Sequence, residues 1–155
     1  MITLKTLEIA EPKREHLSML KQYASVPDDS RDALLKTLLN RAMRIVQEAA
    51  NKTLLPSTLE LTVSDRHQMY EDTVHLYQDP DEIISVTDGE GVAIDYVRGG
   101  RFLRHLPYVD TIIVRYTTKP ALPEADALLA VVLQYATALY DGADSATLNQ
   151  ILAQC

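Results

Sequence analysis

The stretch SRDALLKTLLNRAMRIVQEAANKTLLPSTLELTV, residues 30–63, decides the fold class because its hydrophobic period changes partway along. Its first part predicts a helix over about 30–51, since apolar residues recur there at helical spacing. After Pro56, residues 58–63 alternate between polar and apolar side chains, which is the pattern of a half-buried strand. A long helix followed by strands predicts an α+β chain. The helical stripe consists of Leu34, Leu35, Leu38, Leu39, Ala42, Ile45, Val46 and Ala49.

A shorter helical pattern precedes this stretch. Pro12 suits the first turn of a helix, and a short apolar stripe follows it and stops before Pro27. We therefore expect residues 17–56 to be helical. Residues 1–16 are predicted to form an N-terminal arm or an extra strand.

The central part of the chain has the features of a sheet. Gly99-Gly100 is a candidate two-residue hairpin turn, and Asp88-Gly89-Glu90-Gly91 is a second turn signal. The region 57–119 is therefore predicted to be a β-rich insertion. Its predicted strands cover residues 58–63, 73–77, 83–87, 92–97, 101–104 and 111–118, the last being almost wholly β-branched or aromatic.

Helical spacing returns over 123–155. One helix is predicted from about Pro123 to Tyr140, and a shorter one over 146–153. The predicted fold is therefore α+β and mainly helical, in a single domain over 1–155. Antiparallel helices from both ends of the chain pack together, with a small antiparallel β-sheet inserted between them.

Local end signals accompany the helices. Residues 28–30 (Asp-Asp-Ser) are candidate N-caps for the long helix, and Asn51 suits its end. Gly142 is a plausible stop for the helix that ends near Tyr140, and Asp144 or Ser145 is expected to cap the last helix.

Composition excludes several classes of protein. Apolar residues make up 46% and charged residues 24% of 155 residues, which is ordinary globular composition. The single cysteine, Cys155, cannot form an internal disulfide. We expect no secretory signal and no membrane span, and hence a soluble protein made in the cytoplasm. The net charge of −7 disfavours non-specific binding of the whole chain to nucleic acid.

Motifs for chemistry are missing from the sequence. The four histidines are scattered and have no paired spacing for zinc, and no glycine-rich phosphate loop occurs. Ser64-Asp65-Arg66-His67 contains triad residue types, but neighbours in sequence do not make a triad. The chain is thus predicted to have no catalytic residues, no metal and no cofactor.

Two features suggest binding to other chains. Arg98, Arg101, Arg104 and His105 cluster around the Gly-Gly turn. They are either a charged edge that resists strand addition, or a contact to an acidic neighbour or to DNA phosphates. Arg41 and Arg44, on the polar face of the long helix, are candidate contacts of the same kind.

The second feature is the tyrosine content, with eight Tyr against one Phe and no Trp. Tyrosine suits surfaces that become buried on assembly. Tyr116 and Tyr135 are expected to complete the core instead.

A series of local patterns recurs in a particular order along the chain from about Leu17. They are Leu20–Asp29 with Asp32–Leu39, Ala49–Pro56, Ile84–Gly89, Asp95–Phe102, Ile113–Thr117 and Pro123–Tyr140. In this order they resemble the opening helices, helix exit, central strand, hairpin, last strand and proline-started closing helix of the head-tail connector (adaptor) family of long-tailed phages and prophages. Two departures are Thr118-Lys119-Pro120, where the family has a glycine-containing loop, and the N-terminal extension of about sixteen residues.

The resemblance implies a structural role. Members of this family form a homo-oligomeric ring, often dodecameric, beneath the portal protein. The ring joins the DNA-filled capsid to the tail and carries neck or tail-completion proteins, with only passive, non-specific contact with DNA. The implied location is the host cytoplasm during assembly and then the head-tail junction of the virion. The alternatives are another neck or tail-completion protein, and a small enzyme whose site is built from dispersed Asp, His and Tyr residues.

Overall fold

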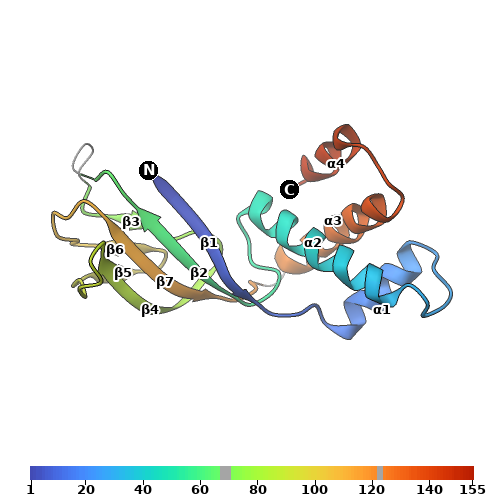
Figure 1. Ribbon diagram of the computed structural model, residues 1–155, viewed down its shortest axis with the longest axis horizontal. Coiled ribbons are helices and arrows are strands. Elements are labelled where there is room, and N and C mark those ends of the chain that lie inside the picture. Colours follow the sequence, from blue (N-terminus) through green and yellow to red (C-terminus); the bar gives the residue numbers. More distant parts are fainter. Residues whose placement is uncertain (67–70, 122–123) are drawn as a thin grey trace. The chain divides into compact units, whose positions relative to one another are not determined.

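The computed structural model describes residues 1–66, 71–121 and 124–155, and Figure 1 shows the helices and strands along the chain. His67, Tyr70 and Pro123, to which the sequence analysis gave roles, lie outside the described residues. The elements in chain order are β1 (Ile2–Ile9), α1 (Arg14–Tyr23), α2 (Asp32–Ala50), β2 (Ser57–Val63), β3 (Val74–His75), β4 (Pro80–Asp88), β5 (Val97–Gly99), β6 (Phe102–Arg104), β7 (Ile112–Thr118), α3 (Glu124–Tyr140) and α4 (Ser145–Leu152).

Contacts divide the chain into two compact units. The β unit consists of Met1–Ile9 and Pro56–Lys119, and the helical unit of Ala10–Leu55 and Pro120–Cys155. The predicted α+β class is therefore confirmed, with the strands in one unit and the helices in the other. The single domain over 1–155 stays a prediction.

The β unit contains two antiparallel sheets, where the sequence analysis expected one. The larger has the strand order β1-β2-β7-β4 and the smaller β3-β6-β5. The N-terminal residues form the extra strand, with Ile2 opposite Val63 and Ile9 opposite Ser57. The second sheet arises because β3 is only two residues long and pairs with β6, not with the larger sheet.

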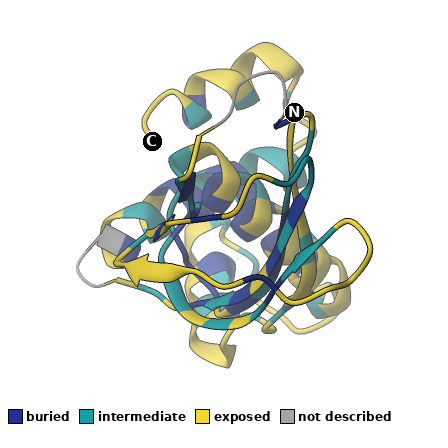
Figure 2. Cartoon of the chain, turned by 90° about the vertical axis from the view of Figure 1, so that its left-hand side faces the viewer, coloured by how far each residue is buried: buried dark blue, intermediate teal, exposed yellow. Residues whose placement is uncertain are grey.

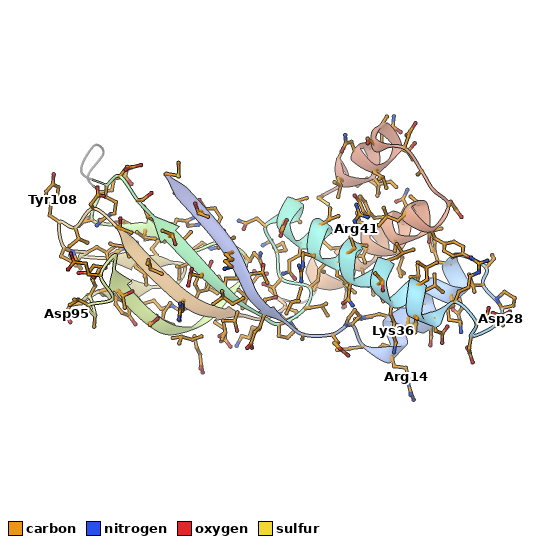
Figure 3. All side chains as sticks on the ribbon, in the orientation of Figure 1. Arg14, Asp28, Lys36, Arg41, Asp95 and Tyr108 are labelled. Carbon is orange, nitrogen blue, oxygen red and sulfur yellow. The ribbon has the colours of Figure 1, made fainter. Side chains whose placement is uncertain are left out.

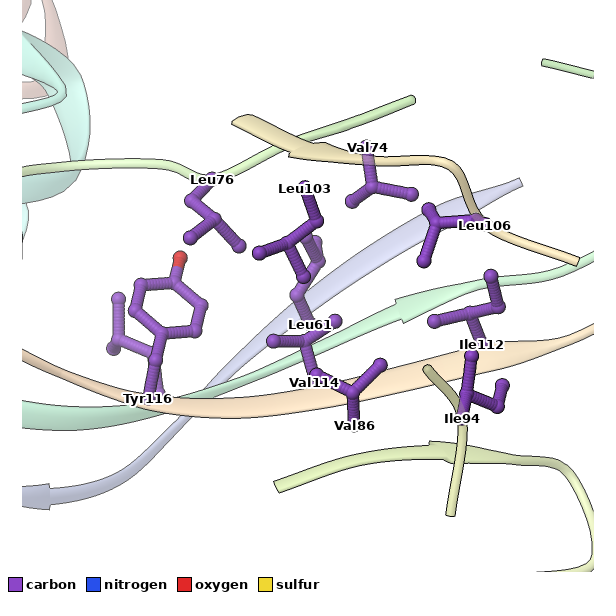
Figure 4. Close-up of a cluster of buried hydrophobic side chains, with 11 residues drawn as sticks. Leu61, Val74, Leu76, Val86, Ile94, Leu103, Leu106, Ile112, Val114 and Tyr116 are labelled. Atoms are coloured by element: carbon purple, nitrogen blue, oxygen red, sulfur yellow. The ribbon is translucent and has the colours of Figure 1, made fainter. Parts of the chain in front are cut away.

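The core of the β unit lies between its two sheets (Figure 4). Strand alternation produces it: Leu61 of β2, Val114 of β7 and Val86 of β4 lie side by side on one face of the larger sheet. Leu103 and Val74 of the smaller sheet pack onto this face. Both sheets therefore bury one face and expose the other.

One predicted turn at the edge of the β unit is confirmed, and the strand predicted after it is wrong. The Oδ1 atom of Asp88 accepts hydrogen bonds from the N–H groups of Glu90 and Val92, so residues 88–92 form the expected turn. The predicted strand over 92–97 is wrong, because the chain pairs with β4 only as far as Ile94, whose side chain enters the core. β5 begins at Val97.

The hairpin turn is displaced by one residue from its predicted place. Gly99 pairs with Phe102, so the two turn residues are Gly100 and Arg101. Gly100 has a φ of 61°, whereas Arg101 is not among the residues with positive φ. Only the first turn residue therefore needs the freedom of glycine, as in a type II′ turn.

The helical unit is built around the contact between α2 and α3, with α1 and α4 also packed on α3. Leu35, Leu39 and Val46 of α2 are fully buried, as are Val132 and Ala136 of α3. Figure 2 shows the buried residues gathered inside the units, with exposed residues over the loops and over most of α4. Helical spacing in the sequence thus fixes which side of α2 packs and which stays exposed.

Most helix ends follow the local signals. Asn51 ends α2 in the left-handed conformation, at a φ of 52°, and Asp144 caps α4 by accepting from the N–H of Thr147 at 2.9 Å. The predicted N-caps of α2 are wrong, since its N-cap is Arg31 and has no capping side chain. Of the predicted caps, Asp28 accepts from the N–H and the hydroxyl of Ser30, and Asp29 forms an ion pair with Lys21.

Candidate assembly surfaces

Few described side chains are arranged for chemistry. Among residues 1–66, 71–121 and 124–155, no group of three or more histidine, cysteine or carboxylate side chains is placed to hold a metal ion. His16 lies on α1, where burial lowers its pKa, and Cys155 is exposed. No helix in the described part of the chain is both long and apolar enough to cross a membrane. Surfaces that bind other chains are therefore the features to consider.

Arg66 holds the loops at one end of the β unit together. Its side chain is 4% exposed and donates to the carbonyl oxygens of Pro107 at 3.1 Å, of Val109 at 2.9 Å and of Glu71. Its own N–H donates to the carbonyl of Asp110 at 3.1 Å. Within the segment that begins Ser64-Asp65, Arg66 is therefore a structural residue. No sequence pattern predicted this role.

Arg98, a predicted interface residue, is engaged within the β unit. It lies opposite Leu103, on the inner face of the smaller sheet. Its guanidinium donates to the carbonyl oxygens of Asp81 and, at 3.3 Å, of Pro80, both at the start of β4. Arg98 therefore links the edges of the two sheets, and part of its hydrogen-bonding capacity is already used.

Arg104 belongs to a row of side chains that begins on the outer face of the smaller sheet and ends at Tyr77, which lies beyond β3 and packs against the core. Its guanidinium carbon lies 5.8 Å from the ring centroid of Phe102, which is a cation–π distance. The ring of Phe102 lies 5.1 Å from that of His75, and His75 lies 5.5 Å from Tyr77. Aromatic residues with an arginine are typical of protein interfaces. We call Tyr77, His75, Phe102 and Arg104 the aromatic row.

The other two predicted residues of the hairpin flank this row. Arg101 is half-buried, and its carbonyl oxygen accepts from the N–H of Leu76 at 2.7 Å. His105 is exposed and has a φ of 57°, a value that few residues other than glycine adopt. The four predicted residues therefore all lie in or beside the hairpin. Arg98 and Arg104 are on its strands, while Arg101 is in its turn and His105 follows β6.

A groove beside β1 adjoins the aromatic row, because His75 and Tyr77 also line the groove. It has a volume of about 410 Å³ and is lined by residues of β1, β2, β3 and the loop after β2. Met1 and Ile2 are 78% and 57% exposed, although Ile2 lies on the core-facing side of its strand. The smaller sheet thus leaves the β1 edge of the larger sheet uncovered. The alternation of apolar and polar side chains over residues 2–6 is the sequence signal for this strand edge.

The opposite edge of the larger sheet is covered. The N–H of Ile94 donates to the carbonyl of Val86, and that of Asp88 to the carbonyl of Val92, both at 2.9 Å. Residues 92–94 and Arg98 therefore occupy the outer side of β4. No described strand pairs with the outer side of β1.

Arg41 and Arg44 are exposed on α2, as is Lys36. Figure 3 labels Arg41 and Lys36. A groove of about 540 Å³ between α1 and α2 adjoins Lys36 and is also lined by Lys13 and Arg14. These five cations lie on the α1–α2 side of the helical unit, where Glu11, Asp29 and Asp32 also line the groove. They belong to a different unit from the hairpin arginines.

The prediction that Tyr116 and Tyr135 belong to the core is confirmed. Tyr116 and Tyr135 are buried, at 0% and 5% exposure. Tyr23 and Tyr108 are exposed, at 54% and 59%. Amphipathic rings are therefore available at the surface of both units.

The two units and their sheet orders define an α+β fold with an antiparallel β sandwich and a helical unit, and clusters of charged and aromatic side chains lie on its surface. No protein-family model matches the chain, and no curated protein matches it. Solved structures with a similar fold include chains from one kind of particle.

Three chains from gene transfer agent (GTA) particles are similar. One, from the neck of an empty GTA particle computed with C6 symmetry, has a TM-score of 0.66 at 14% identity, covering 98% of this chain and 94% of that one. One from the virion of a native GTA particle has the same TM-score and coverage at 15% identity. A third, from the neck of a native GTA particle computed with C12 symmetry, has a TM-score of 0.54 at 16% identity, covering 96% and 94%. At these identities the likeness shows the fold.

Proposed function

We propose that this protein is a structural component of the neck of a phage-like particle, and specifically a head-tail connector. In this role it forms a ring below the portal protein and joins the DNA-filled capsid to the tail. The observation that supports the proposal is the fold, which is shared over nearly the full length of both chains with structures described as GTA necks. The order of sequence patterns supports the same family.

The charge of the molecule suits a passive conduit for DNA. The β unit contains 12 acidic and 7 basic residues, and the whole chain has a formal charge of −7. Tight phosphate binding needs several unopposed cations, and it would obstruct the passage of DNA. We therefore propose that contact with DNA is non-specific and that the partners are further copies of the chain, the portal protein and neck or tail-completion proteins.

Assembly tests the proposal directly. Size-exclusion chromatography with light scattering over a concentration series is expected to show a discrete ring of six or twelve copies, and negative-stain images a central channel. The symmetries of the similar necks motivate these numbers. A chain that stays monomeric at every concentration, and also with purified portal protein, contradicts the connector.

Binding to DNA provides a second test. We expect weak binding to duplex DNA, with little change as salt is raised, because few phosphates are neutralised. Fluorescence anisotropy of a labelled duplex at low and physiological salt measures this. A tight complex that weakens steeply with salt contradicts a passive conduit.

Another neck or tail-completion protein is the second candidate, since the similar structures are described by the neck as a whole. Pull-down separates the two. A connector is expected to bind the portal protein, whereas a tail-completion protein binds only after the connector is present.

A further inference from the structure

The helical unit has opposite charge on two of its sides. Lys36, Arg41 and Arg44 are exposed on α2, and no described acidic residue forms an ion pair with them. Residues 120–155, which include α3 and α4, contain no Lys, Arg or His. Asp126 and Asp141 are exposed on this second side. We call these the basic face and the acidic face.

Packing inside the unit keeps the two faces apart. Leu35, Leu39 and Val46 direct one side of α2 against α3, so the basic residues lie on the side of α2 that faces away from α3. The helix α4 packs on α3 (Figure 1) and has no charged residue of its own, while its exposed N-cap, Asp144, adds a third carboxylate three residues after Asp141. Lys36, Arg41 and Arg44 form no ion pair with described residues of α3 or α4, so both faces remain available to other molecules. Arg31, which precedes α2, is the cation that reaches α3, with its guanidinium carbon 5.9 Å from the ring centroid of Tyr140.

Apolar groups accompany the charges on each face. On α2, Leu34 is 45% exposed and precedes Thr37 and Arg41 at helical spacing. On α3, Ala127 and Ala130 are exposed beside Asp126. Exposed ion pairs contribute little affinity alone, so contact area of this kind is needed for a stable interface, while the charges select the partner and fix the register.

We propose that the basic face of one copy binds the acidic face of the next copy. This inference rests on the proposed ring and names the surfaces that close it. Two unlike faces on one molecule give a head-to-tail interface, which closes into a ring when the rotation between copies permits. The occupant is a second copy because the complementary charge is supplied by the same chain.

Charge reversal on each face provides the test. Arg41→Glu with Arg44→Glu makes both faces acidic, and Asp126→Arg with Asp141→Arg makes both faces basic. Each double variant is expected to need an at least about tenfold higher concentration to assemble, because like charges then meet. Asp144 is left unchanged because it caps α4. Lys5→Glu and Asp95→Arg, which reverse exposed charges on the β unit, are the matched controls and are expected to assemble normally.

Mixing the two double variants gives the decisive measurement. Every interface in an alternating ring of the two pairs an acidic face with a basic one, so an equimolar mixture is expected to restore the ring, with the two chains in equal amounts by mass spectrometry. Circular dichroism checks that both variants stay helical.

The outcomes separate the inference from the function on which it rests. Variants that assemble like the wild type, or a folded mixture that fails to assemble, overturn the pairing of these faces and leave the ring intact. A wild-type chain that never assembles, alone or with portal protein, overturns both.

Discussion

The hydroxyl of Tyr116 accepts a hydrogen bond from the N–H of Tyr77 at 3.1 Å and donates one to the carbonyl oxygen of the same residue at 3.2 Å. Tyr116 is fully buried on β7, and Tyr77 follows β3 in the segment that leads to β4. One side chain thereby satisfies both backbone groups of a residue that has left its strand. The backbone next to the aromatic row depends on this link.

Tyr116→Phe is expected to lower the free energy of unfolding by about 1–2 kcal/mol, because both backbone groups of Tyr77 lose their partner. Urea denaturation followed by circular dichroism measures the change. Tyr23→Phe, at a position that is 54% exposed, is the control and should be close to neutral. Equal stability of wild type and Tyr116→Phe contradicts the role of the hydroxyl.

The difference in the free energy of unfolding between the wild type and Tyr116→Phe should disappear at high pH. Burial raises the pKa of Tyr116 to about 12, above its ordinary value of 10.0. A raised pKa favours the protonated form in the folded state, so this contribution is complete below about pH 10 and is lost as pH rises toward about 12. Paired denaturation curves across this window measure the loss. The comparison with Phe is needed because hydrogen bonds to Asp29 and Asp32 also raise the pKa of Lys21. A difference that stays constant across the window is the contrary result.

Gln47→Met is expected to destabilise the helical unit by about 2 kcal/mol. The Oε1 atom of Gln47 accepts from the N–H groups of Leu54 at 2.8 Å and Leu55 at 3.1 Å, all in a buried setting. A methionine of similar size leaves both donors without this acceptor. Thermal unfolding against Gln150→Met, on exposed α4, provides the comparison. Similar melting temperatures for the two variants exclude this role for Gln47.

Arg98 and Arg104 are expected to behave differently when replaced. Arg98→Ala should cost about 1 kcal/mol of stability, since its hydrogen bonds to the β4 carbonyls are lost. Arg104→Ala should leave stability unchanged within about 0.5 kcal/mol, because its cation–π contact is exposed. Urea denaturation of the two variants is the measurement. A larger loss with Arg104→Ala reverses the assignment.

Asp144→Ala is expected to loosen α4. Accepting from the N–H of Thr147 lowers the pKa of Asp144, so the cap is complete above its ordinary pKa of 3.8 and is lost as pH falls below it. Amide exchange should show lower protection over α4 in the variant at neutral pH, and in the wild type only in acid. Ser145→Ala is the control that should preserve protection.

Sequence periodicity was sufficient to predict the long elements. α2, β2 and β7 lie within about two residues of their predicted limits, because each has a strong apolar pattern. The pairing of β3 with β6 was not predictable, since a two-residue strand has no period. For the same reason, the presence of a second sheet was not predictable.

The candidate surfaces were predictable only as residue types. Arg98 and Arg104 look equivalent in sequence, yet one lies opposite Leu103 and the other opposite Val97, on opposite faces of the smaller sheet. Register therefore decides which arginine is structural. Arg66 was missed because its acceptors are backbone carbonyls about five and forty residues away in sequence.

The unequal edges of the larger sheet limit how far it can be extended. A strand from another molecule can add beside β1, whereas residues 92–94 and Arg98 occupy the outer side of β4. Fibres that grow by strand addition need two free edges on every molecule. The β4 edge is covered at its two ends, so β1 is the more accessible edge of the larger sheet, and addition of a strand beside β1 leaves the covered β4 edge as the limit to further growth of that sheet.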